Sequence, residues 1–248
     1  MNRFSVVIPA RYASTRLPGK PLRKINGKTM LEHVYDRASE SAASTVVVAT
    51  DDERIAEVAE SFGAEICMTG DRHRSGTERI AEVCDLMDWD DDRVVVNLQG
   101  DEPTMPASLV NQCARLLLEG SADIATLASP LQSFADFDNP NVVKVIRDEA
   151  GNAIYFSRAG IPFPRDEAAR ERAVAAALHH HGIYAYRCGV LRRFVVADPS
   201  ELEVCEQLEQ LRALSMGLKI RVGIPDQRPG AGVDTEADLV TVAAQLSH

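Results

Sequence analysis

VVIPARYASTRLPGKPL, residues 6–22, decides the fold, because an apolar strand leads there directly into a basic loop. Residues 4–8 form a short run rich in β-branched side chains, which is typical of a strand covered on both faces in a parallel sheet. Pro9 ends that strand. Because open parallel sheets bind ligands beyond the carboxyl ends of their strands, we expect a ligand at the loop that follows.

The loop has the composition of a polyphosphate-binding site. Small residues keep it thin, and three cations can neutralise several phosphate charges. The small residues are Ala10, Ala13, Ser14 and Gly19, and the cations are Arg11, Arg16 and Lys20. The loop matches neither the Walker pattern GxxxxGK[ST] nor the dinucleotide fingerprint GxGxxG. A basic surface loop without a ligand is the alternative interpretation.

Composition narrows the class of protein. With 248 residues and 45% hydrophobic content, the chain can build one large domain. A formal net charge of −10 argues against nucleic acid or an anionic membrane surface as the main partner. No apolar run approaches the ~20 residues of a membrane span, so we expect a cytoplasmic protein with no membrane partner. The five cysteines show no CxxC pair and are interpreted as reduced thiols.

Strand patterns alternate with helix patterns along the chain, which predicts an α/β fold. The expected strands cover residues 4–8, 46–50, 64–68, 93–98, 123–128, 142–147, 153–156, 182–187 and 219–224. The expected helices cover residues 30–41, 53–62, 76–87, 106–118, 167–177, 201–214 and 236–246. We therefore predict a Rossmann-like three-layer αβα architecture with a mainly parallel mixed sheet. The prediction is a single domain over residues 1–248 that carries a smaller insertion, roughly residues 130–200.

Two aspartates far apart in the sequence are candidate Mg²⁺ ligands. Asp101 follows the expected strand 93–98 and lies at its carboxyl end, beside the basic loop. Magnesium bound through one or two carboxylates and phosphate oxygens is usual in phosphoryl-transfer sites. Asp234 directly precedes an expected helix, so it could instead be an ordinary N-cap. Asp101 could likewise be a turn residue.

Other polar residues have structural interpretations that spacing alone leaves open. Ser75 could cap the helix that follows, with Glu78 completing a capping box. The apolar stripe of the predicted helix 201–214 consists of Leu202, Cys205, Leu208 and Leu211. Glu209 and Gln210 lie outside this stripe, so periodicity alone places them on a solvated helix face. His180 and Tyr184 would face the same side of their strand by the two-residue period.

Nine sequence blocks resemble, in order, the CMP-sugar-acid synthetases, and particularly the branch that activates 3-deoxy-D-manno-octulosonate (KDO). The blocks are ARYASTRLPGKPL (10–22), VVVATDDERI (46–55), SGTERIAEV (75–83), VNLQGDEP (96–103), NPNVVKV (139–145), YFSRAGIP (155–162), HHGIYAYR (180–187), LEQLRAL (208–214) and GVDTEADL (232–239). The resemblance covers nearly the whole chain. Residues 165–178 match no block.

The resemblance implies an enzyme that transfers CMP from CTP to the anomeric 2-hydroxyl of KDO, releasing pyrophosphate, for lipopolysaccharide biosynthesis. It also implies Mg²⁺ as cofactor, CTP and KDO as substrates, and a homodimer in which the insertion serves sugar binding and dimerisation. A related sugar acid, 8-amino-KDO or sialic acid, is one alternative. A non-catalytic nucleotide-binding module is another.

The resemblance also implies residue roles. The catalytic residues would be Arg11, Lys20, Asp101 and Asp234, of which Asp101 and Asp234 would hold the metal. The nucleotide would be bound by Ala10, Arg11, Ser14, Arg16, Lys20, Ser75, Gly76 and Arg79. The sugar acid would be bound by Gln99, Arg158, His180, Tyr184, Glu209 and Gln210.

Overall fold

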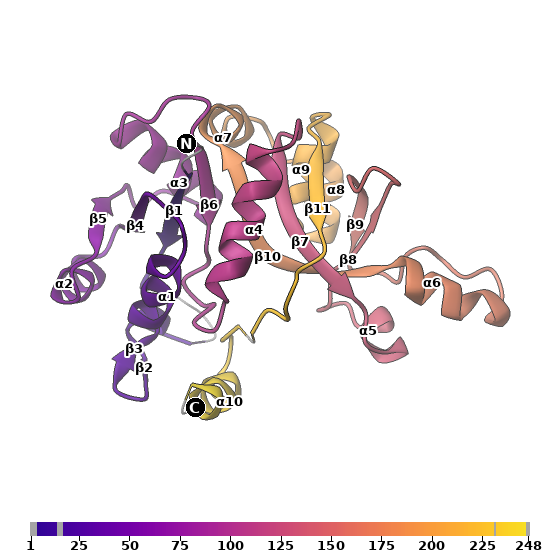
Figure 1. Ribbon diagram of the computed structural model, residues 1–248, viewed down its shortest axis with the longest axis horizontal. Coiled ribbons are helices and arrows are strands. Elements are labelled where there is room, and N and C mark those ends of the chain that lie inside the picture. Colours follow the sequence, from indigo (N-terminus) through magenta and orange to yellow (C-terminus); the bar gives the residue numbers. More distant parts are fainter. Residues whose placement is uncertain (1–3, 14–16, 231, 247–248) are drawn as a thin grey trace.

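The computed structural model describes residues 4–13, 17–230 and 232–246. Within these residues a nine-stranded sheet forms the centre of the molecule (Figure 1). Its main path runs in the order β11 (Ile220–Gly223), β7 (Ile124–Pro130), β10 (Leu178–Arg187), β6 (Val94–Asn97), β1 (Phe4–Pro9), β4 (Thr45–Thr50) and β5 (Glu65–Met68). Two further strands, β8 (Lys144–Arg147) and β9 (Ala153–Ser157), extend the sheet from β10.

Most of the main path is parallel. β1 pairs in parallel with β4 and β6, β4 with β5, and β7 with β11. β10 alone on this path is antiparallel, and it separates β6 from β7. The predicted mainly parallel mixed sheet of a Rossmann-like fold is therefore confirmed.

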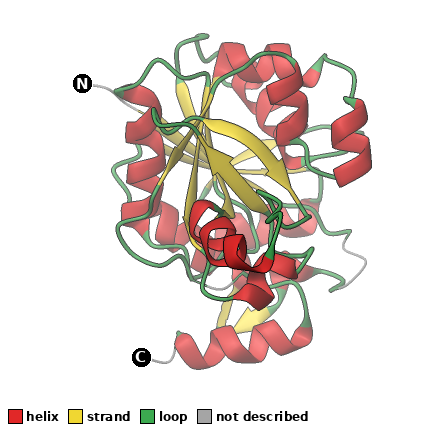
Figure 2. Cartoon of the chain, turned by 90° about the vertical axis from the view of Figure 1, so that its right-hand side faces the viewer, coloured by secondary structure: helices red, strands yellow, loops and turns green. Residues whose placement is uncertain are grey.

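Helices cover both faces of the sheet, as the view in Figure 2 shows. Alternation along β1 separates the two cores, since Val6 and Ile8 point to one face and Val7 to the other. The first face is covered by α1 (Met30–Ser39), α2 (Glu53–Ser61) and α4 (Ala107–Leu118). The second is covered by α3 (Gly76–Leu86), α7 (Cys188–Val195) and α9 (Gln210–Ser215). The three-layer arrangement predicted from sequence is confirmed.

The hairpin β8–β9, the first half of β10 and two small helices project from one side of the sheet (Figure 1). These helices are α5 (Phe134–Asp138) and α6 (Arg170–Ala176), which follows the 3₁₀ turn Glu167–Ala169. They share a small core of Phe137, Ala173 and Ala177. The chain between 130 and 200 thus adds strands to the same sheet.

Some local predictions are wrong. The single helix predicted over 201–214 is two helices, α8 (Glu201–Glu206) and α9, because Gln207 adopts the left-handed conformation with φ of 54°. Leu202 and Cys205, expected on the buried stripe, are exposed. Helices α5 and α7 were not predicted.

The chain after β11 crosses back beneath the sheet to the N-terminal loops (Figure 1). It ends in α10 (Glu236–Gln245), which packs beside the small hairpin β2 (Lys24–Ile25) and β3 (Lys28–Thr29) that follows the 3₁₀ turn Lys20–Leu22. Leu17, Ile25, Val233 and Val242 form a separate buried core there. No helix within the described ranges is long and apolar enough to span a bilayer.

Candidate active site

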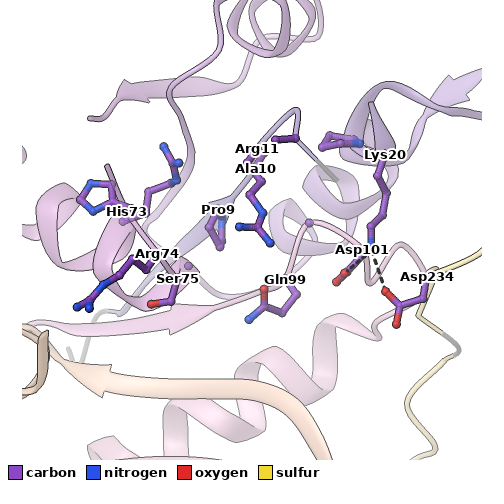
Figure 3. Close-up of a pocket in the computed structure, with 15 residues that line it drawn as sticks. Pro9, Ala10, Arg11, Lys20, His73, Arg74, Ser75, Gln99, Asp101 and Asp234 are labelled. Carbon is purple, nitrogen blue, oxygen red and sulfur yellow. Dashed lines mark hydrogen bonds and ion pairs between the residues drawn. The ribbon is translucent and has the colours of Figure 1, made fainter. Parts of the chain in front are cut away.

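A cavity of about 350 Å³ opens at the carboxyl ends of β1 and β6. Figure 3 shows its lining, which comes from the loop after β1, the start of α3, the loop after β6 and the segment before α10. Nine predicted site residues lie in this lining: Ala10, Arg11, Lys20, Ser75, Gly76, Arg79, Gln99, Asp101 and Asp234. The predicted residues Ser14 and Arg16 lie outside the described residues. The structure therefore brings the described part of the nucleotide and metal sets together.

Glycines let these loops approach one another closely. A Cβ atom at Gly100 would lie 3.0 Å from the carbonyl oxygen of Pro9, closer than side chains normally tolerate. Gly19 has a φ of 64°, a left-handed conformation that suits glycine, directly before Lys20. The loop that carries Asp101 thus runs against the end of β1.

Lys20 joins the two predicted metal ligands. Its Nζ donates to Asp101 Oδ2 at 2.8 Å and to Asp234 Oδ1 at 3.0 Å (Figure 3). It also donates to the carbonyl oxygen of Val233 at 2.9 Å. Burial by itself lowers the pKa of Lys20, but the charges and hydrogen bonds of both aspartates outweigh burial, and the pKa is raised. Lys20 is therefore an ammonium ion at neutral pH.

The N-cap interpretation of Asp234 is wrong. Helix α10 is capped by Thr235, whose hydroxyl accepts from the Asp238 amide in a full capping box. The Asp234 carboxylate is directed to Lys20 instead.

The donor set fits Mg²⁺. Two carboxylates and one carbonyl oxygen already converge on a single cation, and oxygen atoms are the ligands that Mg²⁺ prefers. Within the described ranges, no three His, Cys, Asp or Glu side chains form a closed metal site. An ion held by Asp101 and Asp234 would thus complete its shell with water or substrate oxygens.

Glu102 limits the negative charge beside these aspartates. Burial, followed by repulsion from Asp101 and Asp234, raises its pKa to about 8. At pH 7 its carboxyl group is mostly protonated, so it adds little negative charge beside the two aspartates.

Ser75 caps α3, as predicted, with its hydroxyl accepting from the Glu78 amide at 3.2 Å. The predicted capping box is incomplete, because the Glu78 carboxylate accepts from the amide and guanidinium of Arg74 rather than from the Ser75 amide. Arg79 lies one turn into the helix, buried, with Asp51 and Thr69 as partners. The start of α3 is therefore rigidly held at the edge of the cavity.

Glu209 is not a solvated helix residue. Its Oε1 accepts from the Ser75 hydroxyl at 2.8 Å and its Oε2 accepts from the Thr77 hydroxyl at 2.6 Å. Thr77 is buried, and no sequence pattern indicated its role. Glu209 thereby joins α9 to the wall of the cavity.

His180 and Tyr184 face the same side of β10, as predicted, and their ring centroids are 5.2 Å apart. Four residue steps on β10 oppose only two on β7, because His180 pairs with Ala128 and Tyr184 with Thr126. This bulge, which sequence patterns did not indicate, brings the two rings into contact. Burial, then the neighbouring His181 and His179, lowers the pKa of His180 to about 3, so its ring is neutral.

Tyr184 stands opposite Asn97 in the β10–β6 ladder. Tyr184 Oη and Asn97 Oδ1 are both buried, and neither has a hydrogen-bond partner among the described residues. Asn97 was not predicted as a site residue, although it ends a run of valines in the block VNLQGDEP.

The predicted sugar-binding residues are spread more widely than the nucleotide set. Gln99 lines the first cavity, and His180 lines a second cavity of about 580 Å³ next to it. The loop after β6 borders both, through Asp101 and Glu102. Arg158, Tyr184, Glu209 and Gln210 line neither cavity.

Comparisons with known proteins show the family of this chain. The model of the cytidylyltransferase family matches residues 5–220. A solved structure of CMP:2-keto-3-deoxy-manno-octonic acid synthetase complexed with CTP is similar, with 40% identity, a TM-score of 0.91, and coverage of 99% of this chain and 98% of that one.

Two more distant structures share the fold. A cytidylyltransferase from Leptospira borgpetersenii serovar Hardjo-bovis is 18% identical, with a TM-score of 0.63 and coverage of 100% of this chain and 87% of that one. A 4-diphosphocytidyl-2C-methyl-D-erythritol synthase is 14% identical, with a TM-score of 0.66 and 99% of both chains covered. Because the family model matches residues 5–220 and the CTP-bound synthetase is 40% identical, the chain belongs to the cytidylyltransferase family.

Proposed function

We propose that this protein transfers CMP from CTP to the anomeric 2-hydroxyl of KDO, the sugar acid in the name of the 40% identical synthetase. The observation that carries the proposal is the junction of Lys20, Asp101 and Asp234 at one end of a cavity whose other wall is the capped start of α3. This arrangement offers a triphosphate a cation, hydrogen-bond donors and a place for a metal.

The reaction needs no covalent enzyme intermediate. The KDO 2-hydroxyl gives its proton to solvent water and its oxygen bonds to the α-phosphorus of CTP. The bond between the α-phosphorus and the oxygen that bridges to the β-phosphate breaks, and pyrophosphate leaves with that oxygen. Arg11 and Lys20, with the predicted Ser14 and Arg16, hold the phosphates and stabilise charge on the leaving group. Mg²⁺ bound by Asp101 and Asp234 would offset the charge on the reacting oxygens.

In this proposal the sugar acid lies beside Gln99, the predicted sugar-binding residue of the first cavity. Figure 3 shows Ser75 and Asp234 on opposite sides of Gln99, and Ser75 is bonded to Glu209. Neutral His180 can exchange hydrogen bonds with sugar hydroxyls. Arg158 supplies the cation for the sugar carboxylate.

A homodimer is part of the proposal. Three apolar residues of β9 and α8, Ile154, Leu202 and Val204, are 57%, 46% and 55% exposed. β9 belongs to the insertion to which the resemblance assigns dimerisation, and α8 follows that insertion directly. We also propose that the enzyme acts in the cytoplasm, in lipopolysaccharide biosynthesis.

The test is pyrophosphate release with CTP, KDO and Mg²⁺, compared with UTP, ATP, sialic acid and 8-amino-KDO. Mg²⁺-dependent release with CTP and KDO alone supports the proposal. A preference for another sugar acid would change the substrate and keep the reaction class. No pyrophosphate release with any of these substrates would favour a nucleotide-binding protein without catalytic activity. Asp101→Asn should lose most turnover and retain the fold.

A further inference from the structure

Lys144 is a completely buried lysine in the block NPNVVKV, to which the proposed reaction gives no role. It interrupts the apolar run 142–146 at the start of β8. Burying an ammonium ion is costly unless all its donors are bonded. A buried lysine therefore requires a structural explanation.

The ammonium group uses all three of its donors on main-chain carbonyl oxygens. Lys144 Nζ donates to Asn139 at 2.8 Å, Val142 at 2.6 Å and Arg158 at 2.6 Å. The first two acceptors lie in the loop before β8, and the third follows β9. Burial, the largest influence, lowers the pKa of Lys144. One side chain thus joins the loop 139–142 to the end of the next strand.

The Arg158 side chain is held by hydrogen bonds to two separate segments of the chain. The Arg158 Nη1 donates to the carbonyl oxygen of Pro140 at 3.1 Å, within the loop that Lys144 holds. Its Nε donates to the carbonyl oxygen of Glu206 at 2.7 Å, and its Nη2 to that of Gln207 at 3.4 Å. The Glu206 carboxylate also accepts from the Arg158 amide at 2.8 Å. The guanidinium is therefore held between the loop before β8 and the α8–α9 junction.

The contacts leave Arg158 competent to bind an anion. A guanidinium has five N–H donors, and these three bonds use three of them. The acceptors are neutral carbonyl groups, so the positive charge is not cancelled by them. Two remaining N–H groups, held at a fixed position, suit a carboxylate.

We infer that Lys144 is a positioning residue for the sugar-acid half of the site, which sets the place of Arg158 without touching substrate. The inference rests on the proposed function, in which Arg158 binds the KDO carboxylate. Lys144 acts on the sugar acid and not on the nucleotide, because its contacts include Arg158, a predicted sugar-binding residue, and none of the predicted nucleotide-binding residues.

The experiment compares Lys144→Met, Arg158→Ala and the double variant with the wild-type enzyme, measuring KM for KDO and Kd for CTP. We expect Lys144→Met to raise the KDO KM at least ~10-fold, since small misplacements of binding groups have effects of this order. The Kd for CTP should stay within ~2-fold. If Lys144 acts through Arg158, the double variant should have the same KDO KM as Arg158→Ala alone.

Val145→Ala is the matched control, because Val145 is the next residue of β8 and is also fully buried. It should lower the melting temperature through lost packing and leave the KDO KM unchanged. If Lys144→Met loses CTP binding, Lys144→Gln is measured in its place. Loss of CTP binding in both Lys144 variants would overturn the inference, since Lys144 would then support the whole fold. A normal KDO KM in an active Lys144→Met enzyme, or additive effects in the double variant, would also overturn it. Failure of the wild-type enzyme to form CMP-KDO would refute the proposed function itself.

Discussion

The bridge between Thr77 and Glu209 can be tested by removing one hydroxyl group. Thr77→Val keeps the shape of the side chain and removes its hydroxyl group, which donates to Glu209 Oε2 at 2.6 Å and is also hydrogen-bonded to the Tyr186 side chain. Thr77 is only 3% exposed, so water cannot readily replace the lost donor. A hydrogen bond to a charged group contributes ~1.5–3 kcal/mol, so we expect the free energy of unfolding to fall by about 2 kcal/mol.

Urea unfolding measures this loss, and a double-mutant cycle assigns it to the pair. Thr77→Val, Glu209→Ala and the double variant should give a coupling energy of ~1.5–3 kcal/mol. For a chain of this length a loss of about 2 kcal/mol lowers the melting temperature by roughly 4–8 °C. Thr241→Val is the control, because Thr241 is exposed and its hydroxyl donates to the Ala237 carbonyl oxygen of the same helix. It should change the free energy of unfolding by less than ~0.5 kcal/mol.

A coupling energy below ~0.5 kcal/mol would refute the reasoning, because sites without direct contact are additive within that range. The Thr77 hydroxyl would then contribute nothing to the link between α9 and the cavity wall, and that link would depend on the Ser75 bond to Glu209.

Three further predictions concern charge and thiol chemistry. Lys20→Met leaves Asp101 and Asp234, 37% and 50% exposed, without their shared cation, and with solvent screening we expect the free energy of unfolding to fall by ~1–2 kcal/mol. Mg²⁺ should raise the melting temperature of this variant more than that of the wild type. Equal melting curves for the two proteins would contradict the stabilising role of the Lys20 ion pairs. Burial, and then His179, lowers the pKa of His181 from 6.5 to about 4, so its ring is neutral in the folded protein and gains a proton in the unfolded chain. The free energy of unfolding should therefore fall as the pH drops from 6.5 toward 4. Urea unfolding at several pH values should show a smaller fall for His181→Gln. Only Cys205 is an exposed cysteine, so a thiol reagent should label one site in the folded protein and none in Cys205→Ser, as intact mass will show.

The sequence predicts the elements whose cause is local. Apolar runs and helix periods locate β1, α3 and α4 within one or two residues, because burial of one face decides them. The break at Gln207 was not predictable, since a left-handed residue there carries no glycine signal and is supported by contacts from Arg158.

The site divides in the same way. Lys20 and Asp101 were predictable because each lies in the segment that leaves the carboxyl end of a strand of the sheet, β1 for Lys20 and β6 for Asp101. The choice between a cap and a ligand role for Asp234 depended on which residue caps α10, and Thr235 stands one position later with equal chemistry. The role of Thr77 depends on its hydrogen bond to Glu209, which is 132 positions away in the chain. Long-range pairings of this kind leave no periodic pattern in the sequence.

The return of the chain to its own N-terminal loops makes assembly of the site a late event. Asp234 follows every strand of the sheet, and the core that places it unites Leu17 and Ile25 with Val233 and Val242. During synthesis the sheet can therefore form before Lys20 meets its second carboxylate. A chain interrupted before residue 232 would have the complete sheet and lack half of the acidic pair, so the acidic pair assembles only in chains synthesised past that point.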